Sequence, residues 1–81
     1  MTTRTALIGI IVENENAVEE LNALLHEYRK DIIGRMGVPH PRKDLSIISI
    51  AVEADPDEIS ALSGKLGALE GVSTKTIYSK N

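Results

Sequence analysis

The sequence has no cysteine, phenylalanine or tryptophan, and Tyr28 and Tyr78 are its only large aromatic residues. The lack of cysteine excludes disulfides and thiolate metal sites. The core must be aliphatic, and the stacking side chains that single-stranded nucleic-acid binders use are missing. The net charge of −3 also argues against a phosphate backbone as partner, because such a partner requires a basic stripe. We therefore expect no direct binding to nucleic acid.

Long apolar runs are absent as well. The run from Ala6 to Val12 is too short to cross a membrane as a helix, and the N-terminal segment lacks a signal-peptide cleavage pattern. The apolar share of 42% and the charged share of 26% are typical of globular domains. We expect a cytoplasmic protein without membrane contact.

The length of 81 residues predicts one domain over residues 1–81. A chain of this size buries only about 60% of its unfolded surface, so its stability is marginal unless something supplements the core. Its two histidines are too few to close a structural zinc site by themselves. Association between copies is the remaining source of burial, and we expect a homo-oligomer, either a dimer or a tetramer.

The first half of the chain predicts a strand, a helix and a second strand. The run over residues 6–12 is continuous and rich in β-branched side chains, which is typical of a buried strand. A helix is predicted over residues 16–29, because Asn14–Asn16 supplies an N-cap and apolar residues then recur at spacings of three and four. The second strand is predicted over residues 32–38, where two glycines weaken it.

The second half repeats this order. A loop is predicted over residues 38–44, because its two prolines cannot continue a strand ladder. A strand is predicted over residues 45–52. Asp55 is a helix cap with Pro at the next position, and the helix is expected to run to Gly71. The alternating segment 72–78 predicts the last strand.

This β-α-β-β-α-β order predicts the fold. Right-handed crossovers place both helices on one face of a four-stranded antiparallel sheet. The sequence therefore predicts an α+β protein, a ferredoxin-like βαββαβ sandwich.

The first and third predicted strands are apolar on both faces. In each, the residues that alternate with the helix-facing positions are aliphatic or small, whereas a solvated sheet face normally shows polar residues. One explanation is that strand centres are simply apolar. The other is that a second copy of the chain covers this face. The oligomer interface predicted on the second explanation consists of Leu7, Gly9, Ile11, Leu45, Ile47 and Ser49.

Three side chains are candidates for ligand binding: Arg35, His40 and Lys65. Arg35 stands between two glycines in a predicted strand, so it could be aimed at an anion or at a partner subunit. The alternatives there are a β-bulge or the close approach of another backbone. Lys65 lies in a glycine-containing segment whose spacing is wrong for a phosphate loop and which falls within a helix. A helix packed tightly against a neighbour explains those glycines instead.

Metal and catalytic chemistry have few candidates. His26 and His40 are the only histidines, and a hydrogen-bonded or solvated role is the alternative for each. A metal site using both would require carboxylates and a subunit boundary that brings them together. The sequence shows neither a Ser/His/Asp arrangement nor a pair of acidic residues at the end of a strand, so we predict no catalytic residue and no enzyme activity. The sequence identifies no cofactor.

Several blocks of the chain resemble the family of iron-only hydrogenase system regulators: Ala6–Glu13, Leu25–Tyr28, Ile32–Gly37, Ile47–Ile50, Ala61–Gly67, Gly71–Ser73, Lys75–Thr76 and Tyr78–Lys80. The resemblance implies a ferredoxin-like fold related to ACT domains and to the ligand-binding domain of nickel-responsive repressors. It also implies a genomic association with maturation proteins of the iron-only hydrogenase. The loop over residues 39–42 is less similar to the family than its surroundings.

Two functions remain open. The first is an oligomeric regulatory or ligand-sensing domain that acts through a protein partner or a bound small ligand. The alternative is a metal-handling factor, or a small dimeric ferredoxin-like enzyme with a pocket on the sheet face. A polar cleft that holds a histidine close to a carboxylate would favour the alternative, and a dry aliphatic sheet face would favour the regulator.

Overall fold

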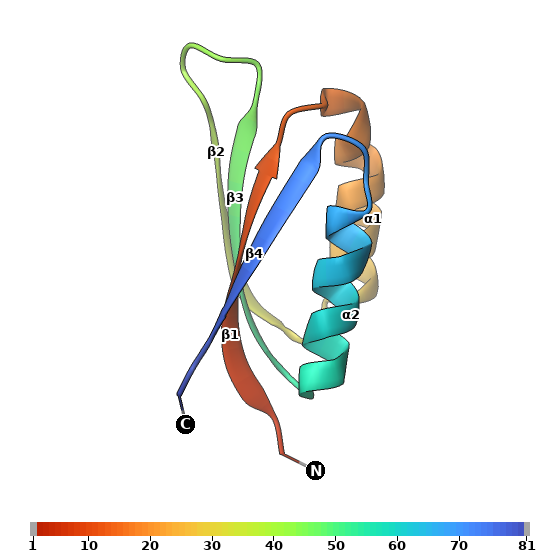
Figure 1. The fold of residues 1–81 in the computed structure, drawn as a ribbon, viewed down its shortest axis with the longest axis vertical. Coiled ribbons are helices and arrows are strands. Elements are labelled where there is room, and N and C mark those ends of the chain that lie inside the picture. The colour runs from red at the N-terminus through yellow and green to blue at the C-terminus, as the bar shows by residue number, and fades with distance from the viewer. Residues whose placement is uncertain (1, 81) are drawn as a thin grey trace.

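Four strands form one antiparallel sheet, and both helices pack against the same face of it (Figure 1). The computed structural model describes residues 2–80. The strand order is β2-β3-β1-β4, so the predicted α+β, ferredoxin-like fold is confirmed. The elements are β1 (Arg4–Val12), the 3₁₀ turn η1 (Glu15–Ala17), α1 (Val18–Glu27), β2 (Ile32–Pro39), β3 (Ser46–Ala54), α2 (Pro56–Gly67) and β4 (Val72–Tyr78). No helix within residues 2–80 is long and apolar enough to span a membrane.

Side-chain caps start both helical segments where the sequence predicts them. The Asn14 side chain accepts a hydrogen bond from the Asn16 backbone N–H at 3.1 Å. The Asp55 side chain accepts one from the Asp57 backbone N–H at 2.8 Å. Each cap satisfies a backbone donor that the first helical turn leaves without a partner. The helix predicted over residues 16–29 is divided between η1 and α1.

The helix predicted to reach Gly71 ends earlier. α2 ends at Gly67, because the chain then forms tighter turns in which the Leu69 N–H bonds to the Leu66 carbonyl and the Val72 N–H bonds to the Leu69 carbonyl. Gly71 itself has a φ of 76°, a conformation that side chains rarely adopt. The predicted terminator therefore belongs to the turn into β4.

One end of α2 packs tightly against β4. A Cβ atom added at Gly67 would lie 3.2 Å from Thr74 Oγ1, whereas one added at Gly64 would meet nothing within 4 Å. The Ser63 hydroxyl also lies 3.3 Å from the Thr74 hydroxyl and accepts a hydrogen bond from the Thr76 hydroxyl at 3.1 Å. The close packing inferred from the helix glycines is therefore found at one of the two.

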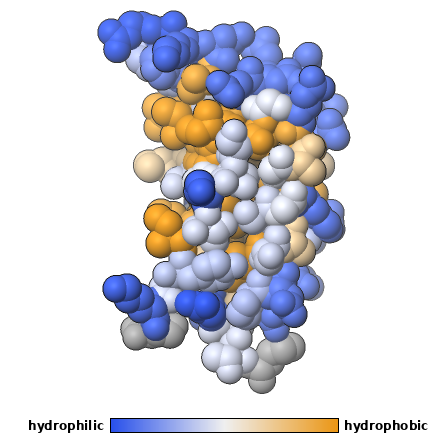
Figure 2. All heavy atoms as spheres, viewed as in Figure 1, coloured by the Kyte–Doolittle hydropathy of each residue, from blue (hydrophilic) through white to orange (hydrophobic). Residues whose placement is uncertain are grey.

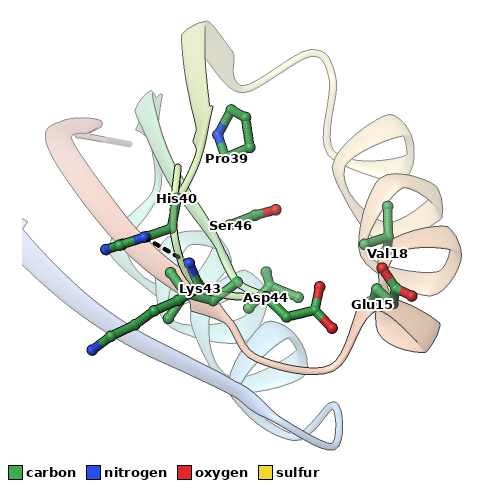
Figure 3. Close-up of a pocket in the computed structure, with 9 residues that line it drawn as sticks. Glu15, Val18, Pro39, His40, Lys43, Asp44 and Ser46 are labelled. Carbon is green, nitrogen blue, oxygen red and sulfur yellow. Dashed lines mark hydrogen bonds between the residues drawn. The ribbon is translucent and has the colours of Figure 1, made fainter.

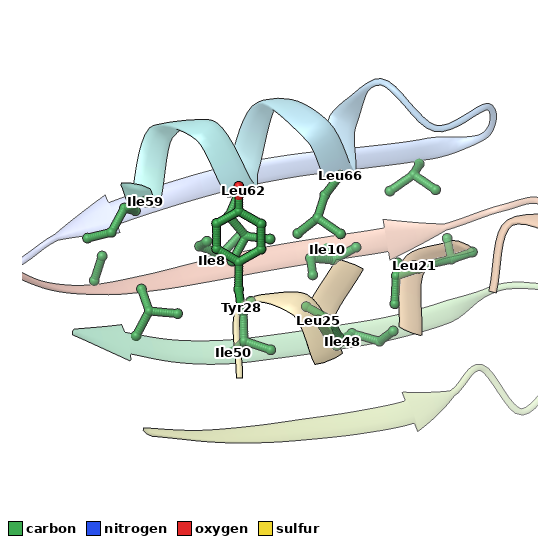
Figure 4. Packing of buried hydrophobic residues seen from close by; sticks show 14 of the residues in the cluster. Ile8, Ile10, Leu21, Leu25, Tyr28, Ile48, Ile50, Ile59, Leu62 and Leu66 are labelled. Carbon is green, nitrogen blue, oxygen red and sulfur yellow. The ribbon is translucent and has the colours of Figure 1, made fainter. Parts of the chain in front are cut away.

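The core lies between the sheet and the helices and is aliphatic apart from Tyr28 (Figure 4). Alternate residues of β1 and β3 point into it, as the sequence pattern predicts. Full burial of one such side chain is worth about 1.5–3 kcal/mol, so this layer supplies most of the stability. The largest fully buried side chains are Ile8, Ile10, Leu21, Ile50, Ile59, Leu62, Leu66 and Val52.

The ends of two strands differ from the prediction. β3 begins at Ser46 and continues to Ala54, so Leu45 lies in the preceding loop. β2 includes Pro39 as its last residue, paired with Ser46. Proline is accommodated there because β2 is an edge strand. An N–H group on the outer side of an edge strand has no neighbouring strand to bond to, so its absence costs no ladder hydrogen bond.

A β-bulge in β2 changes the direction in which its residues point. Pairing advances two residues along β2, from Ile32 to Gly34, for one residue along β3, so Ile33 is an extra residue in the ladder. Arg35 then pairs with the buried Ile50 and lies on the helix side of the sheet, as Ile32 does. The bulge that was one alternative for this glycine-rich segment is thus confirmed.

Candidate functional site

The face of the sheet that the helices leave uncovered is lined mainly by apolar side chains. We name it the open face. Its residues form three rows across β2, β3, β1 and β4: Val38, Ile47, Ile11 and Ser73 in the first, Met36, Ser49, Gly9 and Lys75 in the second, and Gly34, Ala51, Leu7 and Ile77 in the third.

The large apolar residues of the open face are between 37% and 67% exposed. Figure 2 shows hydrophobic side chains gathered around the middle of the molecule and hydrophilic ones at its two ends. Proteins that stay monomeric rarely expose a contiguous apolar surface, and such surfaces mark sites of interaction. The exposed set consists of Leu7, Ile11, Met36, Val38, Ile47 and Ile77.

The middle row of the open face forms a depression in the surface, because its central residues are small. Gly9 and Ser49 lie side by side there, between the pair Ile11 and Ile47 of the first row and the pair Leu7 and Ala51 of the third. A hollow of about 350 Å³ opens over them, with Ile11 and Ile47 on one side and Lys75 at the β4 edge. Lys75 is the one charged side chain in the three rows, so the surface is suited to an apolar contact.

Five of the six residues predicted for the oligomer interface lie on the open face. Leu45 does not lie in β3 and instead lines a hollow beside Val12 and Val18 at the helix side. Met36 and Val38 were missed, because the bulge in β2 reverses the alternation that the sequence alone would suggest. Ile77 on β4 was missed too, although the alternating pattern of the last strand placed it opposite the core residues.

A second candidate surface is a cleft between α1 and β2, on the helix side of the sheet. We name it the cationic cleft. Arg35 donates a hydrogen bond to Asn22 Oδ1 at 3.3 Å, and Arg29 donates one to the His26 carbonyl at 3.0 Å. The predicted ligand residue Arg35 therefore faces this cleft and not the open face. The hollow has a volume of about 350 Å³ and is lined by Asn22, Leu25, His26, Arg29, Ile32 and Arg35.

His40 lies beside a third hollow, of about 250 Å³, at the loop between β2 and β3 (Figure 3). Its Nδ1 accepts hydrogen bonds from the backbone N–H groups of Arg42 and Lys43, both at 3.0 Å. Glu15 and Asp44 also line the hollow, and Figure 3 shows the His40 ring on the far side of it from Glu15. His40 thus fixes the backbone of the loop in this structure.

The two histidines line different hollows, so the chain does not bring them together within one copy. In the part of the chain that the structure describes, residues 2–80, no group of three or more His, Cys, Asp or Glu could hold a metal ion. A metal site at a subunit boundary stays a prediction.

Lys65 joins the two helices. Its Nζ lies 3.7 Å from Glu27 Oε2 and 5.2 Å from the centre of the Tyr28 ring. A hydrogen bond to the Tyr28 side chain, together with the charges of Tyr28 and Glu27, raises the pKa of Lys65. Lys65 does not line the hollows that hold Arg35 or His40, so the three ligand candidates do not form one site.

The chain is similar to known proteins, and these likenesses agree with the fold described above. The family described as "Iron-only hydrogenase system regulator, putative", or TM1266-like, matches residues 4–76. The structure of uncharacterized protein TM1266 from Thermotoga maritima has a TM-score of 0.92 and 39% identity, over 96% of this chain and 99% of that one. A formyltetrahydrofolate deformylase from Pseudomonas putida KT2440 has a TM-score of 0.67 and 11% identity, over 95% of this chain and 29% of the deformylase. The second likeness shows the fold alone.

Curated relatives named "Putative nickel-responsive regulator" come from Saccharolobus islandicus and Saccharolobus solfataricus. Each is 30% identical over 66 residues, which is 82% of this chain and 49% of the relative. The chain therefore spans about half the length of the curated relatives it matches. The names of the family and of these relatives indicate a regulator and not an enzyme.

Proposed function

The chain belongs to the TM1266-like family of iron-only hydrogenase system regulators, and on this premise we propose that it is a regulatory domain that works as a homo-oligomer joined through its open face. The observation that carries the proposal is the uncovered apolar surface of the sheet. The domain has no catalytic site of its own and acts through a bound small ligand or another protein. A cytoplasmic location stays a prediction.

A second copy of the chain is the occupant that the open face suits best. A chain of 81 residues has a limited core, and covering an apolar sheet face adds burial that one copy cannot supply. In a two-fold pair the same patch of each copy contacts the same patch of the other, so a single contact covers the apolar surface of both copies. The low content of charge in the three rows removes the main obstacle to burying them together.

On β2 and β3, large and small residues of the open face are placed so that two copies can interlock. A two-fold axis along the middle row brings the first row of one copy over the third row of the other. Ile47 then faces Ala51, and Val38 faces Gly34. Large residues over small ones fill the space between two packed layers. Over β2 and β3 the face is therefore self-complementary in size, while Ile11 lies over Leu7 and Lys75 lies over its own counterpart at the β4 edge.

The experiment is the substitution Ile47→Asp with the molar mass measured by light scattering during size-exclusion chromatography. A two-fold interface contains the new carboxylate twice, and each unpaired buried charge costs about 3 kcal/mol or more. The sum, about 6 kcal/mol, weakens association on the order of 10⁴-fold. We expect the parent protein at a multiple of 8.8 kDa and the variant as a monomer.

The matched control is Ala61→Asp, which adds the same charge at an exposed position of α2. We expect this variant to keep the mass of the parent. A parent protein that is monomeric at micromolar concentration would overturn the proposal, and so would an unchanged mass for both Ile47→Asp and Ile11→Asp.

The alternative function, a metal-handling factor or an enzyme with a pocket on the sheet face, has less support. The hollow on the open face offers the hydroxyls of Ser49 and Ser73 and the ammonium of Lys75, which are poor ligands for a metal ion. A polar hollow with a histidine and carboxylates does occur elsewhere, but the Nδ1 atom of His40 there already accepts two backbone hydrogen bonds. The open face is better suited to contact than to chemistry.

A further inference from the structure

We infer that the cationic cleft between α1 and β2 binds a small organic oxyanion, that is, a phosphate or carboxylate group carried on a short carbon chain. The inference rests on the proposed regulatory function, because it names the class of ligand that such a domain would sense. The cleft and the open face lie on opposite sides of the sheet, so binding and self-association can be measured separately.

The charge of the cleft is the first argument. The chain has twelve acidic and nine basic residues, yet the lining of this hollow includes two arginines and a histidine and no acid. Within residues 2–80, neither Arg29 nor Arg35 has a carboxylate partner in an ion pair. Each guanidinium has five N–H donors and makes one hydrogen bond to a neighbour in this structure. Most of their donors are therefore available to an anion.

The geometry of the cleft is the second argument. Arg35 extends from β2 and is held by its hydrogen bond to Asn22 on α1. Arg29 extends from the turn after α1 and is held by its hydrogen bond to the His26 carbonyl. An arginine fork matches the paired oxygens of a phosphate or carboxylate, and a fork held in place loses less freedom on binding. Leu25 and Ile32 complete the lining with apolar surface, which suits a carbon chain.

The strand itself is the third argument. The bulge at Ile33 turns Arg35 to the helix side, and Gly37 is the next residue of β2 on that side. A Cβ atom added at Gly37 would meet only the Ile48 side chain, at an ordinary 3.8 Å, so packing within the chain does not demand glycine there. A position without a side chain beside Arg35 keeps the approach to its guanidinium open.

The test is an NMR titration of the full chain, with glycerol 2-phosphate and with succinate as separate probes and sodium chloride at equal ionic strength as the reference. We expect saturable shifts at the amides of Asn22 and Arg35 and at the arginine Nε–H signals. Saturation with the first probe identifies phosphate as the recognised group, and saturation with succinate alone identifies carboxylate. Linear shifts that match sodium chloride for both probes would overturn the inference.

Variants separate the cleft from general charge. Arg35→Ala removes charge-assisted hydrogen bonds and is expected to weaken binding about tenfold or more. Arg35→Lys keeps the charge without the fork and is expected to weaken it by less. Arg42→Ala removes an equal charge from the exposed β2–β3 loop and should leave binding unchanged. Equal losses in Arg35→Ala and Arg42→Ala would show that only net charge matters, which contradicts a site.

The two proposals can fail independently. Saturable binding in a parent protein that is monomeric would overturn the open-face oligomer and support the cleft. Oligomers without saturable binding would overturn the cleft and support the open face. Repeating the titration on Ile47→Asp shows whether the cleft binds its ligand within a single copy, as its lining from one chain predicts.

Discussion

Replacing Gly71 with alanine tests the turn that joins α2 to β4. A Cβ atom at this position would lie 2.6 Å from the Asn14 Cβ and 3.1 Å from the Asn14 backbone nitrogen. The φ of 76° would cost an alanine about 1–2 kcal/mol, and the overlap with Asn14 about 1–3 kcal/mol more. The displaced Asn14 is also the cap of η1, and the Glu13 N–H donates to the Gly71 carbonyl at 2.7 Å. We therefore expect Gly71→Ala to lower the free energy of unfolding by about 2–5 kcal/mol.

The matched control is Gly64→Ala in the exposed face of α2. A Cβ atom there meets nothing within 4 Å, and alanine favours the helix over glycine by about 1 kcal/mol. The same chemical change should therefore raise stability at position 64 and lower it at position 71. The assay is urea unfolding followed by circular dichroism at one fixed protomer concentration, because the stability of an oligomer depends on concentration.

The size of the effect makes the test decisive. For a domain of this length, each kcal/mol shifts the melting temperature by about 4–8 °C, so Gly71→Ala should melt at least about 8 °C below the parent. A Gly71→Ala protein that unfolds at the same urea concentration as the parent would refute the reasoning. It would mean that the turn does not have this conformation, or that Asn14 moves aside without cost.

Two further predictions concern polar contacts. His40→Ala removes the acceptor of two backbone N–H groups in the β2–β3 loop, so hydrogen exchange of those two amides should become faster while the exchange of core amides is unchanged; equal protection in both proteins would contradict this role. The hydroxyls of Thr3 and Thr5 donate hydrogen bonds to the Glu53 carboxylate at 2.7 and 2.8 Å and lower its pKa. Thr3→Val should move that pKa back toward the ordinary 4.5 in an NMR titration of the side chain, and no movement would refute the assignment. Because the pKa is lowered in the folded state, this stabilisation is present at neutral pH and is lost as the pH falls through the folded pKa.

The order of the elements could be predicted because each one carries its own local signal. Asn14 and Asp55 cap their helices by bonds to residues two positions away, and periodicity separates strands from helices within a few residues. The end of α2 could not be predicted in the same way. Its last turns depend on how closely Gly67 approaches β4, and that approach is a tertiary contact.

The candidate sites show the same division. The open face was found in part, because alternation along β1 and β3 alone reveals two apolar sides. The cationic cleft was not found as a site, although Arg35 was singled out. Asn22 and Arg29 come from a helix and the turn that follows it, and nothing in their spacing relates them to a strand residue. Only the packing of α1 beside β2 brings their polar groups together.

The bulge at Ile33 has a consequence for the inheritance of both surfaces. Residues of β2 before it and after it follow opposite alternation, because the bulge absorbs one extra residue while every later residue keeps its pair on β3. Deletion of Ile33 would make the ladder regular, and Arg35 would stay on the helix side while Met36 and Val38 stayed on the open face. The six residues from Gly34 to Pro39 would keep both their identity and their partners on β3. The bulge therefore lets this strand lose one codon without a change in either surface, whereas the same loss within the regular ladder of β1 and β3 would reverse the sides of the residues that follow.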